Sequence, residues 1–137
     1  MQRVVVDANV LLSFITGRID KQRDTAKALL LRAAEGELSA IVPQFVVFET
    51  TYVLQSTYRM PANELVPIVR DLIALPGVLF IEECPWKRVL ELWPSPFASI
   101  ADAAIVAIAE SNRYDAVATF DQKLAKRLKD LGVAAYW

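Results

Sequence analysis

Short apolar runs that favour β-strands alternate along this chain with longer stretches of helical periodicity. The predicted strands are Arg3–Val6, Ala40–Val42, Val78–Ile81, Ala116–Thr119 and Val133–Tyr136. The predicted helices are Ala8–Thr16, Arg23–Glu35, Pro43–Tyr58, Ala62–Leu75, Pro85–Trp93, Ser99–Ser111 and Gln122–Leu131. Because alternating strands and helices favour parallel pairing, we predict an α/β sandwich with a mostly parallel sheet of about five strands.

The composition is that of a compact fold. The chain has 137 residues, 55% of them hydrophobic and 23% charged, so we predict one domain over residues 1–137. Its apolar runs are shorter than a membrane span, and an Asp interrupts the apolar start where a signal peptide needs its core. We therefore expect a cytoplasmic protein that does not contact a membrane. The net charge of −1 means that any polyanion must bind through local patches.

Histidine is absent, which excludes several kinds of chemistry. Ser-His-Asp and Cys-His machinery, an imidazole base and histidine metal ligands all need it. The single cysteine, Cys84, favours neither an internal disulfide nor a zinc cluster. Catalysis by this chain would have to rest on carboxylates, together with a metal that prefers oxygen ligands.

Four carboxylates are predicted to meet at one edge of the sheet. Asp7 ends the first strand and Asp121 follows the fourth strand. Asp102 lies in the first turn of a helix, and Glu49 lies two turns into another. Since the carboxyl ends of parallel strands and the helix starts that follow them share an edge, these side chains should converge where α/β proteins bind their ligands.

Each carboxylate also has a structural explanation. Asp121 fits an N-cap of the last helix. Asp102 forms a capping-box pattern with Ser99. Glu49 has apolar neighbours on its helix face and no Lys or Arg three or four residues away, so a buried salt bridge to a distant residue is the alternative there. Asp7 lies within an apolar run, where an unpaired charge costs several kcal/mol or more.

Like charges in one pocket need a compensating cation. Two carboxylates about 4 Å apart repel by roughly 4 kcal/mol at an effective dielectric constant near 20. An all-oxygen site suits Mg²⁺ or Mn²⁺. Such an ion activates water and polarises a phosphate, so hydrolysis of a phosphodiester needs no histidine.

The segments "VVVDANVLL", "FVVFETTYVL", "SIADAAIVAIA" and "AVATFDQKL" resemble the PIN domain family, and especially its VapC-type toxins, over essentially the whole chain. The resemblance implies a three-layer α/β/α fold and a metal-dependent endoribonuclease. It also implies a homodimer and a cognate antitoxin protein. The matching positions imply a catalytic, metal-binding quartet with two supporting residues: Asp7, Glu49, Asp102 and Asp121, supported by Asn9 and Thr119. We add Ser99, at the start of the helix that contains Asp102, as a further supporting residue.

The chain departs from many relatives around the last acid of the quartet. Asp121 stands alone in "TFDQKL", where many members carry two Asp residues close together. The role that the resemblance implies for Asp121 is therefore the least specific of the four.

Basic residues outside the quartet are candidates for RNA contacts. One cluster follows the first helix and another lies near the end of the chain: Arg18, Lys21, Arg23 and Lys27, and Lys123, Lys126, Arg127 and Lys129. Solvated helix faces are the default explanation of such clusters, and phosphate binding is the alternative.

Three other functions remain open at this stage. An Mg-dependent aspartyl phosphotransferase or phosphatase needs a second Asp two residues after the nucleophile, where this chain has Asn9. A signalling receiver domain needs a phosphate-accepting Asp at the end of a central strand, which "SAIVP" and "VLFIEE" lack. A non-catalytic PIN-like binding module is the third alternative.

Overall fold

The computed structural model describes residues 1–137, with four strands and seven helices. The strands are β1 (Gln2–Val6), β2 (Leu38–Pro43), β3 (Val78–Ile81) and β4 (Ala116–Ala118). The helices are α1 (Ala8–Thr16), α2 (Asp20–Ala34), α3 (Gln44–Ser56), α4 (Ala62–Ile73), α5 (Trp86–Leu92), α6 (Ile100–Ser111) and α7 (Gln122–Asp130). All seven predicted helices are present, with ends that differ by at most a few residues.

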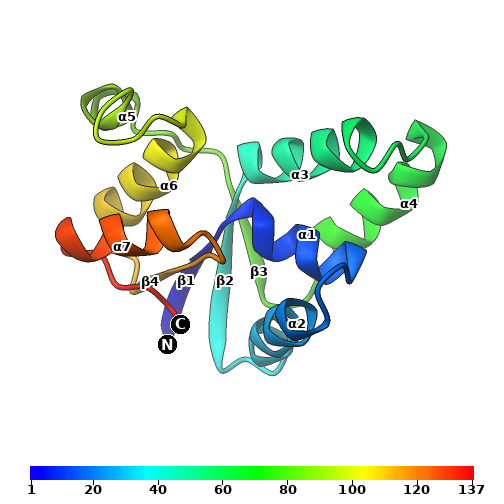
Figure 1. Cartoon of the computed structure of the whole chain (residues 1–137). Coiled ribbons are helices and arrows are strands. Elements are labelled where there is room, and N and C mark those ends of the chain that lie inside the picture. Colours follow the sequence, from blue (N-terminus) through cyan, green and yellow to red (C-terminus); the bar gives the residue numbers. More distant parts are fainter.

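The sheet has the order β3-β2-β1-β4, and every pair of neighbouring strands is parallel. Figure 1 shows α1 to α4 on one side of the sheet and α5 to α7 on the other, so the predicted three-layer α/β/α architecture is confirmed. Val4, Val5 and Val6 of the central strand β1 are completely buried, as expected for a strand that is covered on both faces.

The predicted fifth strand, Val133–Tyr136, is not formed as a strand, and the sheet has four strands instead of about five. The segment makes one isolated parallel bridge, between Val117 and Ala135. Two backbone hydrogen bonds accompany it, from Val117 N to Ala134 O and from Tyr136 N to Val117 O, both 2.9 Å. Because β4 is only three residues long, it offers no further partners for a longer ladder.

Helix α6 lies in the middle of the second helical layer. Its residues from Ala103 to Ala109 are all buried, and four of these seven are alanine, so the helix packs closely against its neighbours. No helix of the chain is both long enough and apolar enough to span a membrane.

The connections reverse direction between β1 and β4. From β1 the chain moves through β2 to the edge strand β3, and then crosses back to β4 on the other side of β1. Ligands of open α/β sheets bind beyond the carboxyl ends of the strands at such a switch point. Asp7 directly follows β1, and Asp121 lies shortly after β4.

Two glycines have nearly the same backbone conformation but different surroundings. Replacing each by alanine therefore distinguishes the cost of backbone strain from the cost of a steric clash. Gly36 and Gly77 have φ angles of +79° and +75°. A Cβ atom on Gly77 would lie 2.0 Å from the carbonyl oxygen of Ala33, whereas one on Gly36 would meet no atom within 4 Å. We expect Gly36→Ala to cost about 1 kcal/mol of unfolding free energy, and Gly77→Ala to cost about 3 kcal/mol or more. Urea unfolding measures both, and equal losses would contradict the predicted clash.

Candidate active site

Asp7 is the most buried of the four predicted carboxylates, with 6% of its surface exposed. It is the N-cap of α1, and its Oδ1 accepts a hydrogen bond of 2.8 Å from the backbone N–H of Ala8. Its Oδ2 accepts one of 2.8 Å from the Thr119 hydroxyl and one of 3.1 Å from the Asn9 amide. These donors keep a carboxylate at the end of a buried strand satisfied and fix its orientation.

Thr119 and Asn9 join the end of β1 to the loop after β4. The Thr119 hydroxyl donates to Asp7 and accepts from the Asn9 amide (3.1 Å) and from the backbone N–H of Asp121 (3.0 Å). The Asn9 carbonyl oxygen accepts from the backbone N–H of Phe120 at 3.0 Å. The hydroxyl thereby uses its one hydrogen and both lone pairs, so the loop that carries Asp121 is positioned directly against Asp7.

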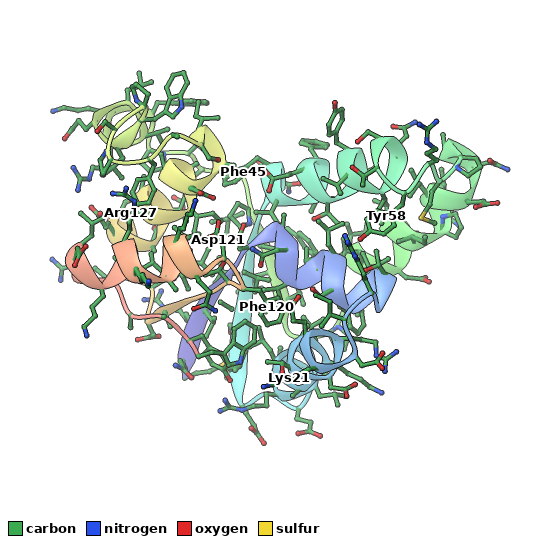
Figure 2. The ribbon with its side chains drawn as sticks, viewed as in Figure 1. Lys21, Phe45, Tyr58, Phe120, Asp121 and Arg127 are labelled. Carbon is green, nitrogen blue, oxygen red and sulfur yellow. The ribbon has the colours of Figure 1, made fainter.

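Asp121 caps the last helix, as one of its two sequence interpretations predicts. Its Oδ1 accepts hydrogen bonds from the backbone N–H groups of Lys123 (2.9 Å) and Leu124 (3.2 Å), and its Oδ2 accepts none. The ring of the preceding residue, Phe120, stacks on Trp137 with 4.7 Å between the ring centroids. Figure 2 shows Asp121 at the start of α7, next to the beginning of α1. The cap and the stack hold one carboxylate oxygen in place and leave the other unengaged.

Asp102 and Glu49 carry carboxylates with no protein partner. Ser99 caps α6, because its hydroxyl accepts from the backbone N–H of Asp102 at 3.3 Å. The Asp102 carboxylate does not return a bond to Ser99, so the reciprocal half of the capping box is absent. The structure contains five ion pairs, and none of them includes any of the four carboxylates. The buried salt bridge that was the alternative for Glu49 is therefore not formed.

Mutual repulsion links the four side chains. The pKa of Asp102 is raised to about 6, first by burial and then by the charges of Asp7 and Asp121. The pKa of Glu49 is also raised, first by burial and then by the charges of Asp7 and Asp102.

Burial likewise raises the pKa of Asp7, and the charge of Asp121 adds to this. The hydrogen bonds from Thr119, Ala8 and Asn9 act in the opposite direction. Asp7, Glu49 and Asp102 thus each lie close enough to other acidic residues of the quartet for their charged forms to be disfavoured, and no ion pair offsets this.

The donor set fits a hard divalent cation that keeps part of its water. No three of the acidic side chains are arranged as direct ligands of one ion. Mg²⁺ is ordinarily held by one or two carboxylates, with waters and substrate phosphates in its other positions. Unengaged oxygens on Asp102, Glu49 and Asp121, next to an oriented Asp7, provide such a site without a cage of protein ligands.

The predicted RNA-binding cations lie in different surroundings. Arg18 lines a groove that also contains Asn9. Lys123 lies in the first turn of α7, two residues after Asp121, the N-cap of that helix. Arg23 is paired with Asp20 and Asp24, at 3.6 and 3.5 Å.

Lys21 lines a separate groove between α2 and the end of the chain, which also contains Tyr136 and Trp137. Figure 2 shows it on α2, beyond Phe120 as seen from Asp121. Of the four predicted cations, Lys123 is therefore the one next to Asp121 in the chain, and Arg18 is the one that lines a groove extending to Asn9.

Sequence analysis missed two glutamates next to the site. Glu82 and Glu83 line a groove of about 480 Å³, together with Glu49 and an apolar wall that includes Phe45, Phe48, Trp86 and Ile100. Figure 2 shows Phe45 at the start of α3, across the strand ends from Asp121. Their position in the sequence could have identified them, because both glutamates directly follow β3 and so lie at the same edge of the sheet as Asp7.

Comparison with known proteins identifies the family. The sequence profile of the PIN domain family matches residues 4–129. The chain belongs to the PIN domain family. No curated protein sequence matches it.

Solved PIN-like structures resemble it in fold. VapC20 of Mycobacterium tuberculosis, described as a "Sarcin-Ricin loop cleaving toxin", has a TM-score of 0.71 and 16% identity, over 90% of this chain and 94% of that one. VapBC2 of Rickettsia felis, bound to a DNA fragment from its promoter, has a TM-score of 0.68 and 15% identity, over 99% of both chains. A domain of a functionally unknown protein from Methanocaldococcus jannaschii has a TM-score of 0.56 and 20% identity, over 100% of this chain and 91% of that one.

The Thr119 hydroxyl is predicted to hold the two halves of the site together. Thr119→Val keeps the shape of the side chain but leaves the Asp121 N–H without its acceptor. It also removes one of the two acceptors of the Asn9 amide and one of the three donors to Asp7. We expect a loss of about 1–3 kcal/mol in unfolding free energy, measured by urea unfolding. Thr119→Ser keeps the hydroxyl and serves as the control. A valine variant as stable as the serine variant would show that the network contributes nothing.

The raised pKa of Asp102 predicts how stability depends on pH without metal. The folded chain holds this proton up to about pH 6, whereas an ordinary Asp loses it near pH 3.8. The contribution of Asp102 to stability is therefore intact below about pH 4 and is lost as the pH rises through 6. In EDTA above pH 6, Asp102→Asn should melt higher than the original chain, by roughly 2–4 °C for each kcal/mol of repulsion removed.

Asp71 provides the control, because it is an exposed carboxylate on α4 without an ion pair. Asp71→Asn should leave the pH profile unchanged. If Asp102→Asn melts lower than the original chain at every pH, this carboxylate is structural and is not under repulsion.

Proposed function

We propose that this PIN domain, over residues 1–137, is a metal-dependent endoribonuclease and the toxin of a VapC-type toxin-antitoxin pair. One observation carries the proposal: carboxylates from four separate segments repel one another at the switch point of a parallel sheet, with no ion pair to neutralise them. Holding like charges close together in a fold is unfavourable unless a cation binds between them. The family membership and the toxins of similar fold support a nuclease.

Asp7 and Asp102 are the proposed direct ligands of Mg²⁺ or Mn²⁺, and Glu49 and Asp121 are proposed to act directly or through water. When bound, such an ion lowers the pKa of water and polarises a phosphoryl oxygen. The protein orients the first ligand through the Thr119 and Asn9 hydrogen bonds to Asp7. Ser99 assists by capping the helix that carries Asp102.

Proton transfer in this site cannot use an imidazole, since the chain has no histidine, and the side chains gathered here are carboxylates. Glu49 is the best candidate for the base, because it lies beside Asp7 and Asp102 and its oxygens accept no hydrogen bond from the protein. A carboxylate with free oxygens can accept a proton from an attacking water.

The partners are part of the proposal. RNA in the cytoplasm is the substrate, and the antitoxin is a second protein, as in the VapBC2 complex of similar fold. Exposed aromatic and aliphatic side chains on α3 and α5 support a protein interface and a homodimer; they are Phe48, Tyr52 and Leu90.

The aspartyl phosphotransferase alternative is less well supported by the site. Its acid or base would occupy the position of Asn9. The Asn9 amide instead donates to Asp7 and Thr119, and its oxygen accepts from Phe120, so the side chain serves to position its neighbours.

Cleavage of a mixture of transfer and ribosomal RNA tests the function. We expect cleavage with Mg²⁺ or Mn²⁺, none in EDTA, and a loss of at least about a hundredfold in Asp102→Asn. Asp71→Asn is the matched control and should keep full activity. Metal-independent cleavage, or full activity in Asp102→Asn, would refute the mechanism. Transfer of phosphate to Asp7 without RNA cleavage would favour the phosphotransferase.

A further inference from the structure

Two grooves of opposite electrostatic character flank the acidic cluster. The first, which we call the α1 groove, has a volume of about 370 Å³ and is lined by residues that include Asn9, Ser13, Arg18, Gln22 and Tyr58. The second, which we call the glutamate groove, is the one lined by Glu49, Glu82 and Glu83. Asn9 connects the α1 groove to the acidic cluster, and Glu49 connects the glutamate groove to it. A substrate bound at the carboxylates could therefore extend in either of two directions.

The α1 groove contains a cation that no protein group neutralises. Arg18 is exposed, and its guanidinium makes no ion pair or hydrogen bond. No carboxylate lines this groove. The glutamate groove has three carboxylates and no Lys or Arg among its lining residues. A phosphodiester backbone is therefore attracted to the first groove and repelled from the second.

The α1 groove also offers groups that suit an unpaired nucleotide. Ser13 donates a hydrogen bond of 3.2 Å to the Gln22 side-chain oxygen, which leaves both amide hydrogens of Gln22 without a protein acceptor. Tyr58 is 37% exposed and makes no side-chain hydrogen bond with the protein. Amide hydrogens can donate to base or sugar oxygens, and an exposed aromatic face can stack on a base.

The groove follows α1 away from the carboxylates. Asn9 is at the beginning of this helix and Arg18 comes shortly after its end, and nine helical residues span about 13 Å. Figure 2 shows Asp121 beside the beginning of α1 and Tyr58 farther along the helix, toward α4. The groove therefore accommodates a short single-stranded segment next to the reacting phosphate.

We propose that the RNA strand leaves the acidic cluster along the α1 groove, with a phosphate bound by Arg18 and an unpaired base stacked on Tyr58. The glutamate groove stays clear of the RNA backbone. This inference rests on the proposed ribonuclease function and adds the path of the substrate, together with two specificity-determining side chains.

Binding of a fluorescent single-stranded RNA oligonucleotide, followed by anisotropy with Mg²⁺ in the Asp102→Asn background, tests the path. Arg18→Gln should weaken binding about tenfold and lower the slope of log affinity against log salt by about 0.7, the value for one phosphate on a single strand. Arg70→Gln is the matched control, because Arg70 is an exposed cation on α4 without an ion pair. It should change neither quantity.

The aromatic contact has its own matched pair. Tyr58→Leu keeps an apolar side chain but removes the ring, and should weaken binding at least fivefold, since base stacking on a ring is worth about 1–3 kcal/mol. Trp86→Leu removes an exposed ring from the glutamate groove and should leave RNA affinity unchanged. Thermal melting of each variant verifies that it is folded.

The outcomes separate the two levels of the proposal. If the chain without substitutions cleaves RNA with metal but Arg18→Gln and Tyr58→Leu bind as tightly as their controls, the path is wrong and the ribonuclease stands. Weaker binding in Trp86→Leu alone would place the RNA in the glutamate groove and also overturn the path. If the unsubstituted chain neither cleaves nor binds RNA, the function and the path fail together.

Discussion

The structure depends on keeping a carboxylate at the end of a strand that is buried on both faces. Asp7 is tolerated there because three donors from Ala8, Asn9 and Thr119 take the place of water. The same donors fix the first turn of α1 and tie the end of β1 to the loop after β4. The arrangement that satisfies the charge thus also sets the position of the other half of the site.

Structural and functional interpretations of the acidic residues are compatible with each other here. Asp7 and Asp121 each cap a helix with one oxygen, and a helix N-terminus favours a negative charge. Asp102 and Glu49 have no such structural partner. A carboxylate that caps a helix with one oxygen still has a second oxygen for a ligand. A sequence pattern that fits a helix cap is therefore weak evidence against a role in a binding site.

The fold was predictable because its signals are local. Apolar runs, glycines and prolines mark strands and helix ends within a few residues of their positions in the structure. The predicted strand Val133–Tyr136 is different, since its pairing depends on how many residues the neighbouring strand offers, and β4 has only three. β4 ends directly before Thr119, whose hydroxyl donates to Asp7, and such a tertiary contact is not contained in a local sequence pattern.

The convergence of the acidic residues was predictable from topology, because parallel strands share their carboxyl edge. Which of the basic residues form ion pairs could not be predicted in the same way. Arg18 and Arg23 look alike in the sequence, yet Arg23 has carboxylates within 4 Å and Arg18 has none. Glu82 and Glu83 follow a strand just as Asp7 does, and the rule that located the quartet applies to them equally. Their groove shows that acidic residues at the strand ends include more than the four that match the family pattern.

The stack of Phe120 on Trp137 has a practical consequence for the design of variants of this protein. Trp137 contacts the residue next to Asp121, so a substitution of this tryptophan removes a ring that supports the loop carrying that carboxylate. Trp137 is therefore best left intact when the chain is engineered.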